Sequence, residues 1–383
     1  MKKKNYFAEI KGNGKTFLLM VALSTSSLLM AQPNLDLGLK LHYTFETANG
    51  TTVPDVSGNG HDGTLYGATV GLTNGKNSLI LSKSGTDYLD MGAGTGSLIS
   101  SLTDFSMSCY IWVNTTNTNL SSNGNMIATF SNSLDSYNQQ VGYMFLQAKR
   151  SRYSITLARY EAEEAVQVGT DVAKGKWVQF TYTQTGTTGK FYQDGVLMNT
   201  NVAVTLTTSS LGSTLYNIIA KPSYAGDAFL QDAQISDFRM YNRAITSDEV
   251  MMLNGYSAEF IEAYKSLTLG NITALTGNIT LPATTGTANI PVNWTSSSPL
   301  VITTDGTVNR PTQYDATVKL TATLTQTVNG VTYTLVKVFN ATVMAYNTVS
   351  DQLAEWNFAG NMINENNGIL TVKDIQSGFV GTV

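Results

Sequence analysis

The sequence predicts an all-β protein, a sandwich or jelly roll followed by a second, smaller β-sandwich. Hydrophobic residues make up 42% of the 383 residues and charged residues only 13%, which is typical of a chain with extended cores and polar loops. From residue 39 to about residue 253, short runs rich in Val, Ile, Tyr, Phe and Thr alternate with clusters of Gly, Asn, Asp and Ser, as in sandwiches and jelly rolls. The clearest of the predicted strands are 106–113, 142–147, 154–159, 177–183 and 189–194.

Residues 1–31 have the pattern of an export signal rather than of a folded element. A basic start precedes an apolar run, 17–31, that is too short to span a bilayer and ends in small residues. We expect cleavage after Ala31, which makes the mature protein secreted, periplasmic or cell-surface, with no membrane span after signal cleavage. An uncleaved anchor is the alternative interpretation.

The charge balance argues against nucleic acid as a partner. The formal net charge is −4, and removing residues 1–31 takes away five lysines and one glutamate, which brings it to −8. An acidic surface repels phosphate backbones, and the sequence has no basic run with interleaved aromatic residues. The single cysteine, Cys109, lies in an apolar predicted strand, so no intrachain disulfide is possible and a buried position is expected.

A closing strand and a following helix are predicted within residues 229–249. Apolar residues stand among polar ones in the first part, and Thr246 with Glu249 then forms a capping-box pattern that opens a helix. Residues 257–267 carry apolar residues at helical spacing and predict a short amphipathic connector.

Three segments, in order along the chain, resemble the LamG-like branch of the concanavalin A-like lectin/glucanase superfamily. They are LHYTFE with DVSGNGHDG near the start, GKWVQFTYT with KFYQDGV in the middle, and ISDFRMYNRAITSDE at the closing strand. The resemblance implies a concanavalin A-like jelly-roll sandwich over residues 35–254 and a helical connector over 255–267. Of the two acidic positions in the family's closing strand, one is Ser236 here, and Asp237 keeps the other.

Residues 268–346 resemble the atrophied bacterial Ig-like domain of secreted polysaccharide-utilisation proteins. The matching stretches are WTSS, DGTVNRP and LTA, in that order. The resemblance implies a small Ig-like β-sandwich with Trp294 in its core. Residues 347–383 contain two strand-like runs but are too few for an independent core, so we interpret them as the start of an incomplete third module.

Enzymatic activity is uncertain and is not expected of this chain itself. The sequence has only two histidines and one cysteine, which are few for a zinc site or a His-activated nucleophile. Glycoside hydrolysis needs two carboxylates, and the densest acidic run is 161–166. Catalytic relatives in the superfamily carry a pattern like E-x-D-x-x-E, which here gives Glu161, Glu163 and then Val166, so the acid/base is missing. We interpret the run as a solvated strand end.

The loop 55–63 has a composition that suits a hard cation. Calcium takes about six to eight oxygen ligands from carboxylates, Asn side chains and backbone carbonyls, and glycines permit the turns that aim carbonyls inward. The family resemblance implies that this loop and the closing-strand acid meet at one calcium ion, with Asp55, Asn59, the Gly60 carbonyl and Asp237 as ligands. A hydrogen-bonded Asx/Gly turn without metal is the alternative.

Aromatic and polar side chains in loops or on polar strand faces are candidates for glycan binding, because rings stack on sugar faces and amides bind hydroxyls. The candidates are Tyr137, Asn138, Gln139, Tyr143, Arg152, Tyr153 and Tyr160. Trp112 and Trp177 lie mid-strand beside apolar neighbours and are expected in the core instead.

These observations predict a secreted, non-catalytic, lectin-like protein that binds a polysaccharide or other glycan and is accessory to polysaccharide recognition or degradation. One alternative is the N-terminal accessory part of a multidomain glycoside hydrolase acting on arabinan or xylan, with a catalytic domain beyond this sequence. A second alternative is a cell-surface adhesion protein.

Overall fold

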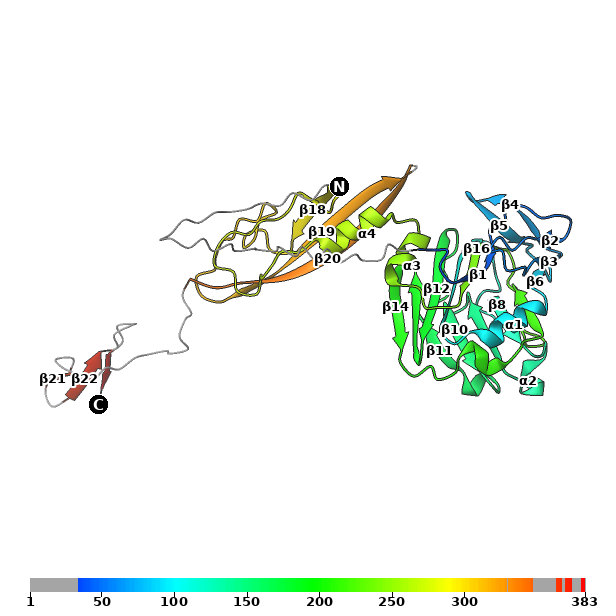
Figure 1. Ribbon diagram of the computed structural model, residues 1–383. Helices are drawn as coiled ribbons and strands as arrows, with labels where there is room; N and C mark the ends of the chain where they lie inside the picture. The colour runs from blue at the N-terminus through cyan, green and yellow to red at the C-terminus, as the bar shows by residue number, and fades with distance from the viewer. Residues whose placement is uncertain (1–33, 329, 347–362, 367–368, 374–379, 383) are drawn as a thin grey trace, which may run out of the picture. The chain divides into compact units, whose positions relative to one another are not determined.

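The computed structural model describes residues 34–328, 330–346, 363–366, 369–373 and 380–382, and Figure 1 labels its helices and strands. The expected export signal, residues 1–31, lies outside the described residues. None of the helices in the described part of the chain combines the length and the apolar character that crossing a membrane requires.

Two eight-stranded antiparallel sheets build the first domain. The first, called here the β7 sheet, has the order β14 (Val196–Asn201), β13 (Thr188–Gln193), β12 (Trp177–Thr185), β7 (Phe105–Val113), β16 (Ala233–Tyr241), β5 (Lys76–Leu81) and β4 (Thr69–Thr73), with β1 (Leu39–Tyr43) also paired to β16. The second, the β9 sheet, has the order β11 (Glu164–Gln167), β10 (Arg152–Thr156), β9 (Tyr143–Gln147), β8 (Met126–Ser131), β15 (Tyr216–Ile219), β6 (Tyr88–Asp90), β3 (Gly63–Tyr66) and β2 (Thr52–Val53). The predicted all-β sandwich is confirmed.

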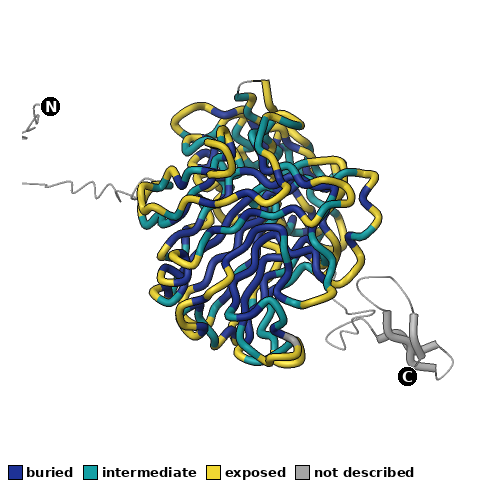
Figure 2. The backbone as a smooth tube through the Cα atoms, turned by 90° about the vertical axis from the view of Figure 1, so that its right-hand side faces the viewer, coloured by how far each residue is buried: buried dark blue, intermediate teal, exposed yellow. Residues whose placement is uncertain are grey.

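Large apolar and aromatic side chains fill the space between the two sheets. Along β7, Phe105, Met107 and Ile111 are fully buried and alternate with outward-facing residues, because successive side chains of a strand point to opposite faces. Tyr153 of β10 stacks on Tyr182 of β12 with ring centroids 3.6 Å apart, which joins the two sheets. Figure 2 shows the buried strands at the centre and the exposed residues in the surrounding loops.

A capped helix, α3 (Ser247–Leu253), follows the closing strand as the sequence predicted. The Thr246 hydroxyl accepts a hydrogen bond from the Glu249 amide, and the Glu249 carboxylate accepts one from the Thr246 amide. This capping box satisfies amides that have no partner inside the helix. Arg243 adds an ion pair of 2.7 Å with Glu249, which fixes the chain where it leaves β16.

The second domain is built on a four-stranded sheet with the order β17 (Thr284–Thr285), β18 (Ile290–Ser296), β19 (Ala316–Val328) and β20 (Val331–Val343). Trp294 is 7% exposed and belongs to the core, and its indole N–H donates to the Pro282 carbonyl at 2.8 Å. The predicted connector forms α4 (Ala258–Ser266), whose apolar face is buried.

Three short strands, β21 (Ile363–Asn366), β22 (Ile369–Lys373) and β23 (Val380–Thr382), form a separate sheet near the C-terminus. They fall within the segment expected to begin a third module. Residues 347–362 of that segment lie outside the described residues.

The prediction that Trp112 and Trp177 are core residues is wrong. Both are partly exposed on the outer face of the β7 sheet, because their strand neighbours Ile111, Val113 and Val178 take the inward positions. The two rings meet edge to face at 5.8 Å. The Trp112 indole N–H donates to the Asn114 side chain at 2.9 Å, just after β7, and the Trp177 indole N–H donates to the Asn74 carbonyl at 2.8 Å. Trp177 therefore links the β4–β5 turn to this face.

Candidate functional site

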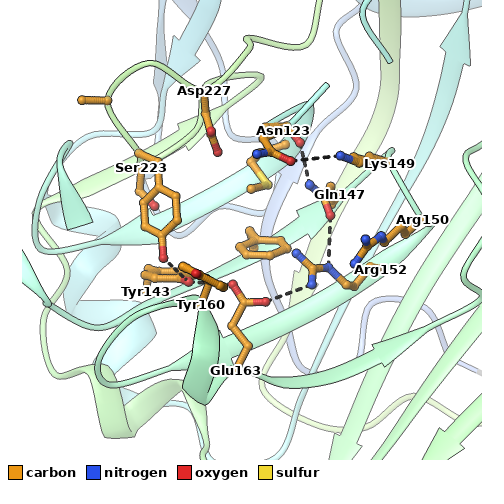
Figure 3. A pocket seen from close by; sticks show the side chains of 15 residues that line it. Asn123, Tyr143, Gln147, Lys149, Arg150, Arg152, Tyr160, Glu163, Ser223 and Asp227 are labelled. Carbon is orange, nitrogen blue, oxygen red and sulfur yellow. Dashed lines mark hydrogen bonds and ion pairs between the residues drawn. The ribbon is translucent and has the colours of Figure 1, made fainter. Parts of the chain in front are cut away.

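A cavity of about 680 Å³ lies on the outer face of the β9 sheet (Figure 3). Strands β8, β9 and β10 supply its floor, and three loops around residues 123–124, 149–150 and 223–227 supply its walls. These loops are far apart in sequence but come together because β8 pairs with both β9 and β15. The antiparallel register of the sheet therefore creates the cavity.

Strand alternation decides which side chains face the cavity. In β9, Met144 and Leu146 point into the sandwich core, so Tyr143, Phe145 and Gln147 point outward to the cavity. In β10 the same alternation buries Tyr153 and Ile155 in the core and presents Arg152 and Ser154 on the outer face.

A network centred on Glu163 occupies the cavity floor. Tyr143 donates its hydroxyl to Glu163 Oε1 at 2.6 Å, Ser154 donates to Oε2 at 3.0 Å, and Arg152 Nη1 pairs with Oε2 at 2.9 Å. Arg152 Nε also donates to Gln147 Oε1 at 3.1 Å. The Glu163 side chain is only 7% exposed, so its three partners replace the water that its charge has lost.

The same network continues upward to the rim of the cavity. The hydroxyls of Tyr143 and Tyr224 are 2.6 Å apart; because Tyr143 donates to Glu163, Tyr224 is the donor between them. Tyr224 in turn accepts from the backbone N–H of Tyr160, a rim residue that is 54% exposed. The network of Tyr160, Tyr224, Tyr143, Glu163 and Arg152, called here the Glu163 network, therefore links the rim to the floor.

Burial and charge set the protonation of these groups. Burial, together with the charge of Glu163, raises the pKa of Tyr143 well above its usual range, so this hydroxyl stays protonated and donates. Burial lowers the pKa of Arg152, although the Glu163 carboxylate opposes the shift. Burial raises the pKa of Asp227 on the opposite wall, against the charge of Lys149.

Three of the seven predicted glycan-binding residues meet at this cavity, namely Tyr143, Arg152 and Tyr160. Asn138 is exposed on α2 (Ser136–Gln139) outside the cavity lining, and its amide donates to Asp135. Tyr137 and Gln139 belong to the same helix, and the Tyr137 side chain lies outside what the structure describes. Tyr153 is corrected: it is fully buried between the sheets and is inaccessible to a ligand.

The interpretation of residues 161–166 as a solvated strand end is also wrong. Glu161 is exposed and pairs only with Arg159 at 3.1 Å, but Glu163 lies at the cavity floor. Glu164 accepts hydrogen bonds from Thr205 and from the amide of Leu206. Sequence reasoning missed Glu163, Lys149, Arg150 and Asp227, because only the tertiary pairing of β8, β9 and β15 brings their segments together.

The loop expected to bind calcium is organised by hydrogen bonds to Asp55. Oδ1 accepts from the amides of His42 and Ser57, and Oδ2 accepts from the Ser57 hydroxyl and the His61 amide. Burial alone would raise the pKa of Asp55, but these donors outweigh it and lower the pKa. A carboxylate has about four lone-pair positions, and four donors occupy them, so Asp55 has none left for a metal.

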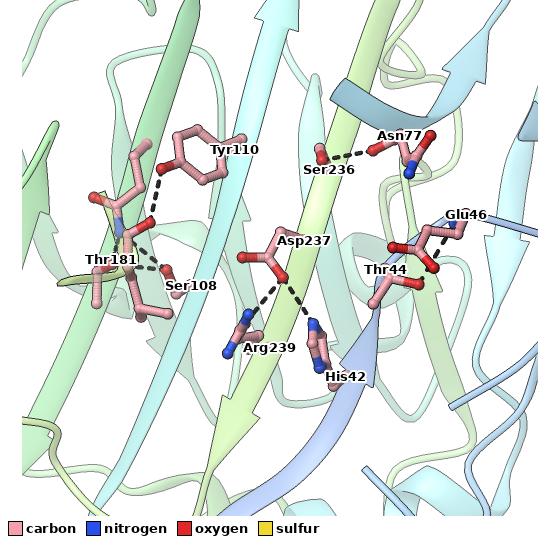
Figure 4. A network of polar contacts seen from close by, with 12 residues as sticks. His42, Thr44, Glu46, Asn77, Ser108, Tyr110, Thr181, Ser236, Asp237 and Arg239 are labelled. Atoms are coloured by element: carbon pink, nitrogen blue, oxygen red, sulfur yellow. Dashed lines mark hydrogen bonds and ion pairs between the residues drawn. The ribbon is translucent and has the colours of Figure 1, made fainter. Parts of the chain in front are cut away.

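The closing-strand acid, Asp237, also has side-chain partners of its own (Figure 4). It lies at a β-bulge with φ 51°, and its Oδ1 contacts His42 Nε2 at 2.7 Å and Arg239 Nε at 2.9 Å. Lys76 also acts electrostatically on Asp237. His42 and Arg239 thus both contact Oδ1 of Asp237, and the Ser236 hydroxyl donates to the Asn77 carbonyl.

Three of the expected calcium ligands, Asp55, Asn59 and Asp237, thus take part in other contacts in this arrangement. Asn59 is exposed, and its amide nitrogen donates to the Ser57 hydroxyl at 2.9 Å, which makes it part of the turn. Gly60 has φ 79° and supplies the left-handed backbone of that turn. Among the described residues no three His, Cys, Asp or Glu side chains come together in a group able to hold a metal ion.

Comparison with known families defines the two domains. Residues 83–251 match the concanavalin A-like lectin/glucanases superfamily, and residues 261–346 match the atrophied bacterial Ig domain. The chain thus carries a concanavalin A-like domain followed by an atrophied bacterial Ig domain, in the order that the sequence motifs predicted. A comparison with curated protein sequences finds no match.

Several solved structures are similar to this chain. Domain 4 of an extracellular arabinanase from Geobacillus stearothermophilus, in complex with arabinotriose, is 13% identical, with a TM-score of 0.43 over 56% of this chain and 98% of that chain. A Trypanosoma rangeli sialidase mutant with trans-sialidase activity is 14% identical, with a TM-score of 0.40 over 57% and 32%. The binding domain of botulinum neurotoxin DC, in complex with SialylT, is 14% identical, with a TM-score of 0.39 over 91% and 79%. Similarities this low carry no information on which ligand this chain binds.

Proposed function

We propose that this chain is a carbohydrate-binding protein and that its glycan site is the cavity on the outer face of the β9 sheet. The observation that carries the proposal is the Glu163 network, which fixes donors and acceptors at the cavity floor by contacts within the protein. Polar groups that are already in place bind a ligand with a smaller loss of conformational entropy. The match of this domain to a lectin and glucanase superfamily supports the proposal.

The rim and the floor of the cavity have different roles in this proposal. Tyr143 and Phe145 are each 1% exposed, so their ring faces are covered and cannot stack on a sugar. Tyr160 is 54% exposed at the rim and offers a ring that can. A sugar ring lies against Tyr160, and its hydroxyls reach the polar groups of the walls and floor.

The site binds without catalysis in this proposal. A glycosidase needs one carboxylic acid and one carboxylate that both reach the scissile bond. Glu163 is held by Tyr143, Ser154 and Arg152, so its oxygens face protein donors. Val166, at the position of the missing acid/base, is 1% exposed in the core. The protein then serves polysaccharide recognition outside the cytoplasm, after cleavage following Ala31.

A binding titration with two tyrosine variants tests the proposed site. Wild-type protein is titrated with a panel of plant and bacterial polysaccharides and their oligosaccharides. Tyr160→Ala should weaken binding about fivefold or more, since it removes the stacking ring. Tyr216→Ala is the matched control, because Tyr216 is 37% exposed on the same sheet but outside the cavity lining.

Two results would contradict the proposal. One is the absence of binding to every glycan in the panel by folded wild-type protein. The other is a Tyr160→Ala variant that binds as tightly as the Tyr216→Ala control, which would move the site elsewhere.

A further inference from the structure

Three cationic side chains, Lys149, Arg150 and Arg152, lie close together along one wall of the cavity (Figure 3). The cavity lining has only two carboxylates, Glu163 and Asp227. The site therefore carries an excess of positive charge in a chain whose formal net charge is −4. This local excess opposes the overall charge balance and points to a ligand that is itself negative.

The two carboxylates of the cavity already have partners. Glu163 pairs with Arg152, and the charge of Lys149 acts on Asp227. Lys149 Nζ also donates to the Asn123 side chain at 3.1 Å. Among the described residues, the Arg150 side chain has no hydrogen-bond or ion-pair partner, and Arg152 Nη2 makes no hydrogen bond. Guanidinium donors are thus left over on this wall.

The two arginines act on each other as like charges. Burial lowers the pKa of Arg152, and the nearby charge of Arg150 adds to that shift. An anion that touches both guanidinium groups would relieve this repulsion and would also supply the missing acceptors.

The backbone at Arg150 is held in one conformation, which fixes the position of its Cα and Cβ atoms. Arg150 and Ser151 both have positive φ, 60° and 43°, a conformation that is unfavourable for residues other than glycine. Neighbouring groups hold this turn: the Arg150 amide donates to Asp171, the Gly169 amide donates to the Arg150 carbonyl, and the Ser151 hydroxyl donates to the Thr170 carbonyl. The turn is therefore anchored on both sides of Arg150.

We propose that the cavity selects an acidic glycan, whose oxyanion lies between the guanidinium groups of Arg150 and Arg152. The proposal rests on the carbohydrate-binding function proposed above and adds the class of sugar that the site takes. The planar guanidinium fork matches the two oxygens of a uronate carboxylate, and a sulfate ester offers the same oxyanion.

Three glycans with related chemistry test this proposal. Wild-type protein is titrated with oligogalacturonates, with the same oligosaccharides after reduction of their carboxyl groups, and with a sulfated galactan. We expect binding of the oligogalacturonates to exceed that of the reduced form by about tenfold or more, and to weaken as salt is raised.

Two charge-matched variants separate Arg150 from the overall charge of the protein. Arg150→Gln should lower affinity for the acidic oligosaccharides about tenfold and leave affinity for the reduced form unchanged. Lys176→Gln removes one positive charge at an exposed position away from the cavity and should change neither. Arg150→Lys keeps the charge without the fork and should retain part of the preference.

Each outcome is distinguishable from failure of the carbohydrate-binding proposal. Equal affinity of the wild type for the acidic and the reduced oligosaccharides would overturn the inference while leaving glycan binding intact. A preference that persists in Arg150→Gln would overturn it as well. Arg150-dependent binding of the sulfated galactan alone supports the oxyanion and identifies a sulfate ester as its source. Binding of none of the three, nor of any neutral glycan, would remove the proposed function itself.

Discussion

Two carboxylates on different sheets of the first domain, Glu163 beside β11 and Asp237 in β16, are each held by an arginine in a similar way (Figures 3 and 4). Around Asp237, the His42 ring and the Arg239 guanidinium converge on one oxygen. Around Glu163, Arg152 keeps a terminal nitrogen that makes no hydrogen bond within the described part of the chain, and the network lines an open cavity.

The difference shows what separates a structural polar network from a binding site. Both networks satisfy a partly buried charge, which is the condition for burying it at all. The Asp237 network lies at the β-bulge of β16 and connects this strand to β1 through His42. The Glu163 network does more, because its outer members still offer donors to a space that a ligand can enter. Four predictions test this contrast, from the largest expected effect to the smallest.

Removing the two carboxylates in turn should give unequal losses of stability. Glu163→Ala leaves Arg152, whose side chain is 17% exposed, without a counter-charge, and should lower the free energy of unfolding by about 3 kcal/mol. Asp237→Ala should cost about half as much, since Asp237 is 27% exposed and water can reach its partners. Urea denaturation of both variants measures the difference. Equal losses would mean that the two networks are not distinguished by burial.

The aromatic cluster on the β7 sheet should matter for stability but not for binding. Trp177→Ala removes the edge-to-face contact with Trp112 and the hydrogen bond to Asn74, and should cost about 2 kcal/mol. Trp177→Phe keeps a ring and loses the N–H donor, so about 1 kcal/mol is expected. Glycan affinity should stay at the wild-type value in both, because the cavity is on the other sheet. A loss of affinity in folded Trp177→Ala would place a second binding surface here.

These contrasts also show what a single sequence can reveal. The alternation of apolar residues in β7, the capping box at Thr246 and the family motifs were local, so they predicted strands, the start of α3 and the two domains. The alternation of side chains along β7 also places Trp112 on the outer face, but the residues on both sides of it are apolar, so the sequence alone did not reveal this. Side chains with both polar and apolar parts are the ones for which this pattern is ambiguous.

The cavity could not be predicted, because long-range register creates it. Glu163 and Asp227 are far apart in sequence, and they line the same cavity because β8 lies between β9 and β15. For the motif loop, the sequence matched a calcium pattern, but it could not show that the amides of His42, Ser57 and His61 donate hydrogen bonds to Asp55.

Lowering the pH should change the contributions of Asp237 and Asp227 to stability in opposite directions. Burial alone would raise the pKa of Asp237, but its bond to His42 and the charge of Arg239 lower it, so its ionised form stabilises the fold. That contribution is fully present above the unfolded pKa of 3.8 and is lost as pH falls through the lower folded value. Burial raises the pKa of Asp227, so its ionised form destabilises the fold above the folded value, and protonation relieves this cost.

Asparagine variants of Asp237 and Asp227 test the opposite contributions of their ionised forms to stability. At neutral pH, Asp237→Asn should be less stable than the wild type and Asp227→Asn more stable. The Asp227 difference should shrink as pH falls through its raised folded pKa and should be gone below 3.8, whereas the Asp237 difference should shrink only below 3.8, as pH falls through its lowered folded pKa. Thermal melts across pH 3 to 7 measure both. If Asp227→Asn were destabilising at neutral pH, the ionised Asp227 carboxylate would have a favourable interaction that outweighs the cost of its burial.

The smallest expected effect is that of calcium. An ion that binds only the folded state stabilises it by RT ln(1 + [L]/Kd), about 2.7 kcal/mol at a hundredfold excess, which is a shift of a few degrees for a domain of this size. Asp55 has four donors on its two oxygens and Asp237 faces Arg239, so calcium should raise the melting temperature no more than magnesium does. Asp55→Asn, which keeps an acceptor oxygen but loses the charge, should respond to calcium as the wild type does. A calcium-specific shift that disappears with chelator and in Asp55→Asn would contradict this prediction. It would show that Asp55 exchanges its four hydrogen bonds for a calcium ion, which requires the other ligands of the ion to lie within reach of the same loop.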